Sequence, residues 1–124
     1  MDTTLRDGEQ TSGMSFSSSE KLTIAKLLLE ELNVDRIEIA SARVSDGEFT
    51  AVKNITNWAK ENDYLNKVEV LTFLDNGVSI NWLSESGAKV QNLLTKGSFN
   101  HLKYQIRKTP KDHFNDVYNS VYDA

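Results

Sequence analysis

A short run of charged and polar side chains follows the first β-like residues of the chain. It reads Leu5-Arg6-Asp7-Gly8-Glu9-Gln10, and ten residues separate it from Lys21. An arginine beside a carboxylate that can bind a metal suits chemistry in which an enolate must be stabilised. The arginine and the metal ion would both supply positive charge at a reacting oxygen. The run therefore predicts a site for an anionic intermediate.

The composition of the chain excludes several classes of function. The 124 residues correspond to about one domain, and 39% of them are hydrophobic, which is enough for a core. The net charge of −4 gives no electrostatic footprint for a nucleic acid. The chain has no Cys, no long apolar run and no basic-then-apolar start, so we expect no disulfide, no membrane span and no signal peptide. A cytoplasmic location is expected.

Hydrophobic periodicity predicts strands and helices in alternation. The strands are expected at Asp2–Leu5, Val34–Ala40, Lys67–Phe73 and Ala88–Leu94. The helices are expected after Ser17 as far as Leu32, after Ser45 as far as Ala59, over Val78–Ser86, from Ser98 to Ile106, and from Pro110 onwards. Ser17 with Glu20, and Ser45 with Glu48, have the spacing of a capping box. Gly87 suits the residue after a helix, and Pro110 suits the first residue of one.

Four βα units in a row predict a parallel sheet covered by helices. The short connections favour a (β/α)8 TIM barrel, and since such a barrel needs about 250 residues, this chain would supply its first half. We therefore expect residues 1–124 to be the N-terminal half of a barrel-shaped catalytic domain, a fragment. A doubly wound open sheet is the alternative, but the glycine-rich nucleotide fingerprint is missing after the first strand.

In a barrel, the carboxyl ends of the strands meet at one mouth. After the first strand this mouth would carry Arg6, Asp7, Glu9 and Gln10; after the second, Glu38, Ser41 and Arg43; after the third, Leu71, Phe73 and Asp75; after the fourth, Asn92, Leu94 and residues 95–98. The expected pocket is charged on one side and apolar on the other. Such a pocket suits a small keto acid with a short alkyl group.

The same segments carry a family resemblance. The motif at residues 5–10 followed by Lys21, together with Val34–Ala40, Leu93–Ser98 and Lys108–Pro110, resembles the 2-isopropylmalate, homocitrate and citramalate synthases. The likeness covers essentially the whole chain and is strongest, through Glu38–Ser45 and Ala88–Val90, to bacterial (R)-citramalate synthases. HMG-CoA lyase is a more distant relative. The resemblance implies an acyltransferase of isoleucine or leucine biosynthesis, which joins acetyl-CoA to a 2-oxo acid in a Claisen-type condensation.

Matching positions then imply roles for individual residues. Asp7 matches a ligand of a divalent metal, which could be Zn, Mn or Mg. Arg6 matches the arginine that contacts the keto-acid oxygens and stabilises developing charge, and Gln10 matches an amide near the substrate. Glu38 matches a strand-end glutamate that resembles a residue supporting catalysis in the lyase branch.

The apolar wall of the pocket would consist of Leu71, Phe73 and Leu94. Isopropylmalate synthases usually carry a histidine where Asn92 stands here. A tight apolar wall favours pyruvate over a branched keto acid by about 1–3 kcal/mol for each methylene.

Several expected parts of such a site are not found in the sequence. The family has a His-x-His pair of metal ligands, whereas this chain has only His101 and His113, both expected on the surface. No general base is identified, and the chain by itself is expected to be inactive. The resemblance makes a homodimer the expected assembly.

Other interpretations of the same residues stay open. A lyase that runs the reverse carbon–carbon cleavage is one, and a non-catalytic half-barrel that associates through its free strand edges is another. Arg6 and Asp7 could be a simple ion pair, and Leu71, Phe73 and Leu94 could be core residues. The apolar stripe of the last helix is expected to be a packing surface, and it consists of Phe114, Val117, Tyr118, Val121 and Tyr122.

Overall fold

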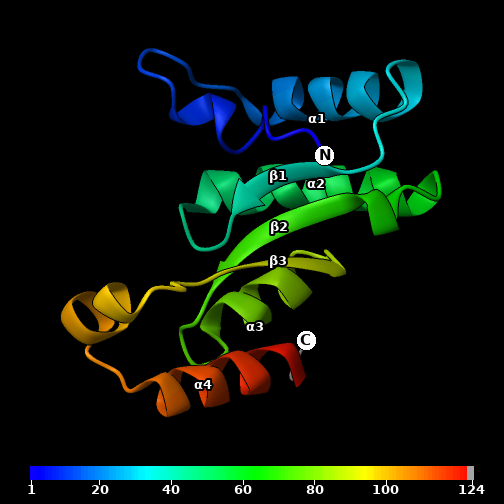
Figure 1. Cartoon of the computed structure of the whole chain (residues 1–124). Helices are drawn as coiled ribbons and strands as arrows, with labels where there is room; N and C mark the ends of the chain where they lie inside the picture. The colour runs from blue at the N-terminus through cyan, green and yellow to red at the C-terminus, as the bar shows by residue number, and fades with distance from the viewer. Residues whose placement is uncertain (123–124) are drawn as a thin grey trace.

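The computed structural model describes residues 1–122 and shows one parallel sheet flanked by helices (Figure 1). Its strands are β1 (Ile37–Ser41), β2 (Val68–Phe73) and β3 (Val90–Leu94), in the spatial order β1-β2-β3. Both strand pairs are parallel, and a helix lies in each connection. The expectation of consecutive parallel βα units is therefore confirmed.

The helices begin where the capping residues predict. They are α1 (Ser18–Lys26), which continues as a π-helix (Leu27–Glu31), α2 (Asp46–Glu61), α3 (Val78–Glu85), a second π-helix (His101–Ile106) and α4 (Pro110–Tyr122). Two short 3-10 turns cover Gly8–Gln10 and Leu65–Lys67. Ser17 and Glu20 form a complete capping box, which satisfies two backbone N–H groups at the start of α1.

The core lies between the sheet and the helices α1 and α2 (Figure 1). Ile37 and Ile39 of β1, and Val68 and Val70 of β2, point into it, because side chains alternate between the two faces of a strand. Its fully buried aliphatic residues include Leu29, Ile37, Ile39, Val52, Ile55, Val68 and Val70. Burying each such side chain stabilises the fold by about 1.5–3 kcal/mol. The remaining strand residues point to the opposite face, where the candidate site residues lie.

The strand predicted at Asp2–Leu5 is reduced to a single bridge, so that prediction is wrong. Asp2 pairs with Ile37 in parallel, but the chain turns directly afterwards. The carbonyl of Thr3 accepts hydrogen bonds from the N–H groups of Arg6, Asp7 and Gly8 at 3.1, 2.7 and 3.2 Å. These local bonds use groups that a longer strand would have offered to β1. The same turn places Arg6 beside the carboxyl end of the sheet.

The aromatic stripe of α4, predicted to be a packing surface, is exposed within residues 1–122. Phe114, Tyr118 and Tyr122 are 69%, 67% and 79% exposed. The helix instead turns His113 inward, and Ser120 lies within reach of the β3 side chain of Gln91 at 3.5 Å. The buried His113 at the start of α4 thus fixes the rotation of the helix, and the most apolar side of the helix is left exposed.

Two loops at the carboxyl edge of the sheet are joined through Asp75. Its carboxylate accepts hydrogen bonds from the N–H and the hydroxyl of Ser79, at 2.9 and 2.6 Å, and from Arg43 at 2.9 Å. Burial alone would raise the pKa of Asp75, but these three donors outweigh it and lower the pKa below its usual value. The connection between β2 and α3 is thereby tied to the connection between β1 and α2.

A pH dependence of stability follows from this carboxylate. Because its folded pKa is lowered, Asp75 stabilises the fold above its unfolded pKa of about 3.9, and this contribution is lost as the pH falls through the folded pKa. We expect Asp75→Asn to lower the urea midpoint at neutral pH. The difference in urea midpoint between the variant and the wild type should become smaller in acid. Urea unfolding at several pH values measures this, and a difference of constant size would contradict it.

No helix within residues 1–122 combines the length and the apolar character needed to cross a bilayer.

Candidate active site

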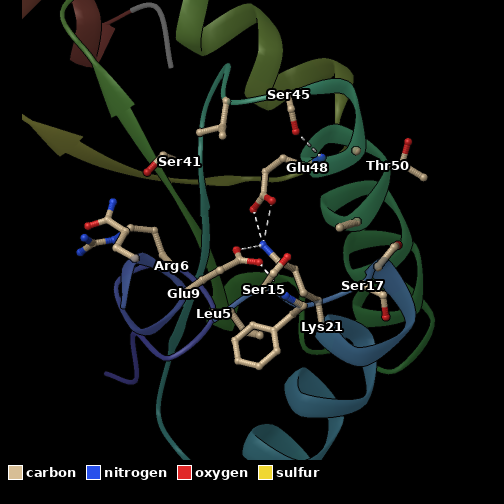
Figure 2. A pocket seen from close by; sticks show the side chains of 16 residues that line it. Leu5, Arg6, Glu9, Ser15, Ser17, Lys21, Ser41, Ser45, Glu48 and Thr50 are labelled. Atoms are coloured by element: carbon tan, nitrogen blue, oxygen red, sulfur yellow. Dashed lines mark hydrogen bonds and ion pairs between the residues drawn. The ribbon is translucent and has the colours of Figure 1, made fainter. Parts of the chain in front are cut away.

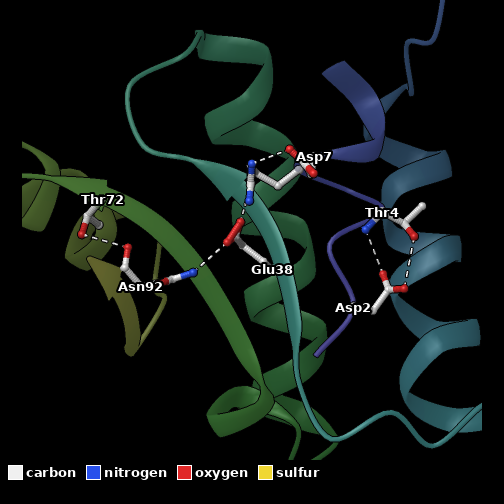
Figure 3. Close-up of polar contacts among 7 residues, drawn as sticks. Asp2, Thr4, Asp7, Glu38, Thr72 and Asn92 are labelled. Atoms are coloured by element: carbon white, nitrogen blue, oxygen red, sulfur yellow. Dashed lines mark hydrogen bonds and ion pairs between the residues drawn. The ribbon is translucent and has the colours of Figure 1, made fainter. Parts of the chain in front are cut away.

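Arg6, Glu38 and Asn92 form a chain of polar contacts over the sheet face that points away from the helices (Figure 3). The guanidinium of Arg6 donates through Nε to Oε1 of Glu38 and through Nη1 to Oδ1 of Asp7, the latter at 2.8 Å. Asn92 donates from Nδ2 to the other oxygen of Glu38 at 2.7 Å. The buried carboxylate is therefore held from both sides, and it fixes the direction in which Arg6 points.

The strands explain why these side chains meet. Glu38 lies between the core residues Ile37 and Ile39 on β1, so it points to the sheet face opposite to the helices. Asn92 on β3 shares that face, because it pairs in register with Leu71 on the intervening strand. Glu38 is 1% exposed, whereas the side chain of Arg6 retains 21% exposure. The guanidinium is thus anchored from below and still open to a ligand.

The described residues do not by themselves make a metal site. Asp7, the predicted ligand, has 61% of its side chain exposed and pairs with Arg6. No group of three or more His, Cys, Asp or Glu residues within residues 1–122 could hold a metal ion. Three protein ligands are typical of a catalytic zinc site. Asp7 could therefore supply one ligand of such a site.

The other predicted site residues divide between two cavities. Gln10 and Arg6 line a cavity of about 660 Å3 between the first loop and the N-termini of α1 and α2 (Figure 2). Phe73 and Leu94 line a second cavity of about 490 Å3, beside the loop that follows β3. Leu71 is buried and lies in register between Ser41 and Asn92. The structure thus unites Arg6, Asp7 and Glu38, while the apolar residues lie apart from Gln10.

A buried ionic cluster in the first cavity was not predicted. Nζ of Lys21 lies 2.5 Å from Oε2 of Glu9, and 2.6 and 2.7 Å from the two carboxylate oxygens of Glu48 (Figure 2). Lys21 is 1% exposed. Burial raises the pKa of Glu9, but the hydrogen bonds from Lys21 and from the N–H of Phe16 outweigh it, so the pKa is lowered.

The sequence held a signal for this cluster in the spacing of Lys21 from the motif. Glu48 was expected only to cap α2. In the structure its N–H does bond to Ser45 Oγ at 3.1 Å, but both its carboxylate oxygens contact Lys21. The role of Asn92 as a partner of Glu38 was also missed, since an amide on a strand gives no indication of its partner.

The two histidines behave differently from each other. His101 is exposed, as expected, but His113 is 4% exposed, so its predicted place on the surface is wrong. Its Nε2 lies 2.9 Å from Oγ1 of Thr95, while its buried Nδ1 has no hydrogen-bond partner. This contact attaches α4 to the loop after β3.

Comparison with known proteins agrees with this geometry. A family model described as HMGL-like matches residues 1–124. The chain belongs to the HMGL-like family. This is a TIM-barrel family, and the parallel βα units of the HMGL-like chain agree with part of such a barrel, so both the predicted fold class and the family resemblance are confirmed.

Curated relatives of the HMGL-like chain are named as synthases. It is 42% identical over 108 residues to the (R)-citramalate synthase CimA of Methanocaldococcus jannaschii. The matched region covers 87% of this chain and 21% of the relative. It is 38% identical over 122 residues to the 2-isopropylmalate synthase of Sulfolobus acidocaldarius, with 97% of this chain and 30% of the relative covered. The chain therefore spans less than a third of the length of these relatives.

Proposed function

We propose that this HMGL-like chain contributes the keto-acid side of the active site in an acyltransferase. The enzyme would condense acetyl-CoA with a 2-oxo acid, either pyruvate to citramalate or 2-oxoisovalerate to 2-isopropylmalate. The observation that carries this proposal is the Arg6 guanidinium, anchored by Glu38, which is buried on the face of a parallel sheet that points away from the helices. The names of the relatives support the same class of reaction. Because the chain spans only part of those relatives, the activity is proposed for the full protein.

In the proposed reaction, a base removes a methyl proton from acetyl-CoA. The resulting enolate carbon attacks the keto carbon, a carbon–carbon bond forms, and the carbonyl electron pair moves onto oxygen as an alkoxide. Arg6 would hold its positive charge at that oxygen, and since Glu38 and Asp7 already fix its direction, little reorganisation is needed during the step. The alkoxide then takes up a proton to become the hydroxyl group, and one water hydrolyses the thioester to a carboxylate and releases CoA. Glu38 orients Arg6 in this scheme, and the base is not assigned to a residue of this chain.

The identity of the 2-oxo acid would depend on the apolar residues near this edge. Leu71 is buried on the same sheet face as Asn92, which itself contacts Glu38. We expect Leu71→Ala to enlarge this wall and to shift kcat/KM about tenfold towards a longer 2-oxo acid, since one methylene is worth about 1–3 kcal/mol in an apolar pocket. Competition between pyruvate and 2-oxobutyrate measures the shift. An unchanged ratio would place the side chain of Leu71 outside the pocket.

The proposal extends to the cofactor and the assembly of the full protein. We include a divalent metal, to which Asp7 would contribute one carboxylate ligand, and a homodimer as the assembly. Chelation should abolish turnover, and added Zn²⁺, Mn²⁺ or Mg²⁺ should restore it. Retained turnover after exhaustive chelation would remove the metal from the proposal.

The test is the release of free CoA by the full protein. Acetyl-CoA is mixed with pyruvate, with 2-oxoisovalerate, or with no keto acid, and the free thiol is followed over time. We expect release that depends on one of the keto acids and yields the matching hydroxy diacid. Formation of acetyl-CoA from a hydroxyacyl-CoA would instead indicate a lyase. No release with any keto acid would overturn the proposed function.

A further inference from the structure

We propose that Lys21 is a positioning residue, which holds the loop that carries Arg6 and Gln10 through its contacts with Glu9 and Glu48. The consequence for catalysis rests on the proposed function, whereas the consequence for the loop can be measured without any substrate. Lys21 itself lies on α1, outside the loop, and it is not assigned to contact a substrate.

The contacts join three segments that are far apart in the sequence. The ammonium of Lys21 touches three carboxylate oxygens at 2.5 to 2.7 Å, one from the first loop and two from the first turn of α2 (Figure 2). Its three N–H donors match these three acceptors in number. Lys21 is nearly inaccessible to solvent, so its buried ammonium depends on these three contacts.

Glu9 connects Lys21 to the loop that carries Arg6 and Gln10. It lies in the 3-10 turn at Gly8–Gln10, one residue from Gln10 and three from Arg6. Its second oxygen, Oε1, accepts the N–H of Phe16 at 3.0 Å, which closes the loop from residue 9 to residue 16. Residues 11–15 are all exposed, and so contribute little packing of their own. The carboxylate of Glu9 is therefore the main tie between this loop and the helices.

The charges of the cluster make Lys21 its essential member. With the lysine present, one positive charge lies between two carboxylates. Without it, Glu9 and Glu48 would face each other across the same small space as like charges, and the loop would move away from α2. Such a movement would displace Arg6 and Gln10 together.

The experiment compares Lys21→Met with a matched control in the full protein. The control is Arg36→Met, which removes the ion pair of another buried glutamate, Glu69, and does not involve the first loop. Hydrogen–deuterium exchange is followed for peptides that cover residues 6–16. We expect exchange there to be about tenfold faster in Lys21→Met and unchanged in Arg36→Met. Unchanged exchange in this loop, or an equal increase throughout the chain, would overturn the proposal.

Steady-state kinetics distinguish a positioning role of Lys21 from a general loss of folded enzyme. Lys21→Met should raise KM for the 2-oxo acid and lower kcat, while KM for acetyl-CoA stays the same. Fewer folded molecules would lower kcat alone. If Lys21→Met does not fold, Glu9→Gln replaces it, because it keeps the pair of Lys21 with Glu48 and weakens only the tie to the loop. Glu9→Gln should change the exchange of the loop, KM for the 2-oxo acid and kcat in the same directions as Lys21→Met, but by smaller amounts.

The outcomes distinguish the two proposals from each other. A wild-type protein with no keto-acid-dependent release of CoA, together with faster exchange of residues 6–16 in Lys21→Met, would overturn the proposed function and support the role of Lys21 in the loop. An active wild type whose kinetics are unchanged by Lys21→Met would overturn the positioning role and support the function.

Discussion

Arg6→Lys is expected to lower kcat of the full protein by about 100-fold or more. The guanidinium of Arg6 uses Nε for Glu38 and Nη1 for Asp7, and its planar fork can present further N–H groups to a substrate oxygen at the same time. A lysine ammonium is a single point of charge, so it could bond Glu38 or reach the alkoxide but not both. The expected size follows from the loss of one oxyanion donor, which costs about 10²–10³ in kcat.

Steady-state kinetics with saturating keto acid and acetyl-CoA measure this effect. Arg36→Lys serves as the control, because Arg36 is largely exposed and pairs with Glu69 away from the carboxyl edge of the sheet. It should leave kcat unchanged. Near-normal turnover in Arg6→Lys would remove Arg6 from the reaction, and Arg6 and Asp7 would then be no more than an ion pair in a turn.

Glu38→Gln is expected to reduce both stability and turnover. The carboxylate of Glu38 accepts from Arg6 and Asn92 in a fully buried position, and hydrogen bonds to charged groups contribute about 1.5–3 kcal/mol each. The amide keeps the shape of the side chain but loses the charge, and one of its two ends becomes a donor. We expect the free energy of unfolding to fall by about 2 kcal/mol, and kcat to fall at least about tenfold because Arg6 loses its direction.

Glu69→Gln provides the matched control for this variant. Glu69 is also a buried strand glutamate with an arginine partner, and it pairs in register with Glu38 on the neighbouring strand. Its replacement should lower the urea midpoint but leave kcat of the folded enzyme unchanged. Equal effects of the two variants on kcat would mean that Glu38 supports the fold only.

Apolar side chains remain exposed on α4 and near the β3 side of the sheet. The sheet of residues 1–122 ends at β3, and both the α4 stripe and the side chains of Phe73 and Leu94 remain partly or largely exposed. A complete barrel would cover strand edges and fill its interior. The domain assignment, half of a barrel over residues 1–124, stays a prediction, as does association through these surfaces.

The sequence by itself determined the parallel order of strands and helices, the capping of α1 and, through residues 5–10, the family to which the chain belongs. These features depend on local patterns: hydrophobic period, a serine three residues before a glutamate, and an arginine next to an aspartate. The sequence also predicts that Glu38 lies near Arg6, which is confirmed, but its predicted place at the carboxyl end of the strand is wrong, since Glu38 is the second residue of β1.

Only the tertiary structure decided which side chains became partners. Asn92 meets Glu38 across 54 positions in the sequence, and Lys21 meets Glu48 across 27. It also decided that the first strand shrinks to a bridge, and that α4 buries His113 rather than its aromatic stripe. The physical reason is common to all of these cases. Strand register and helix rotation are set by the packing of the whole chain, and the partner of a polar side chain follows from them rather than from its neighbours in sequence.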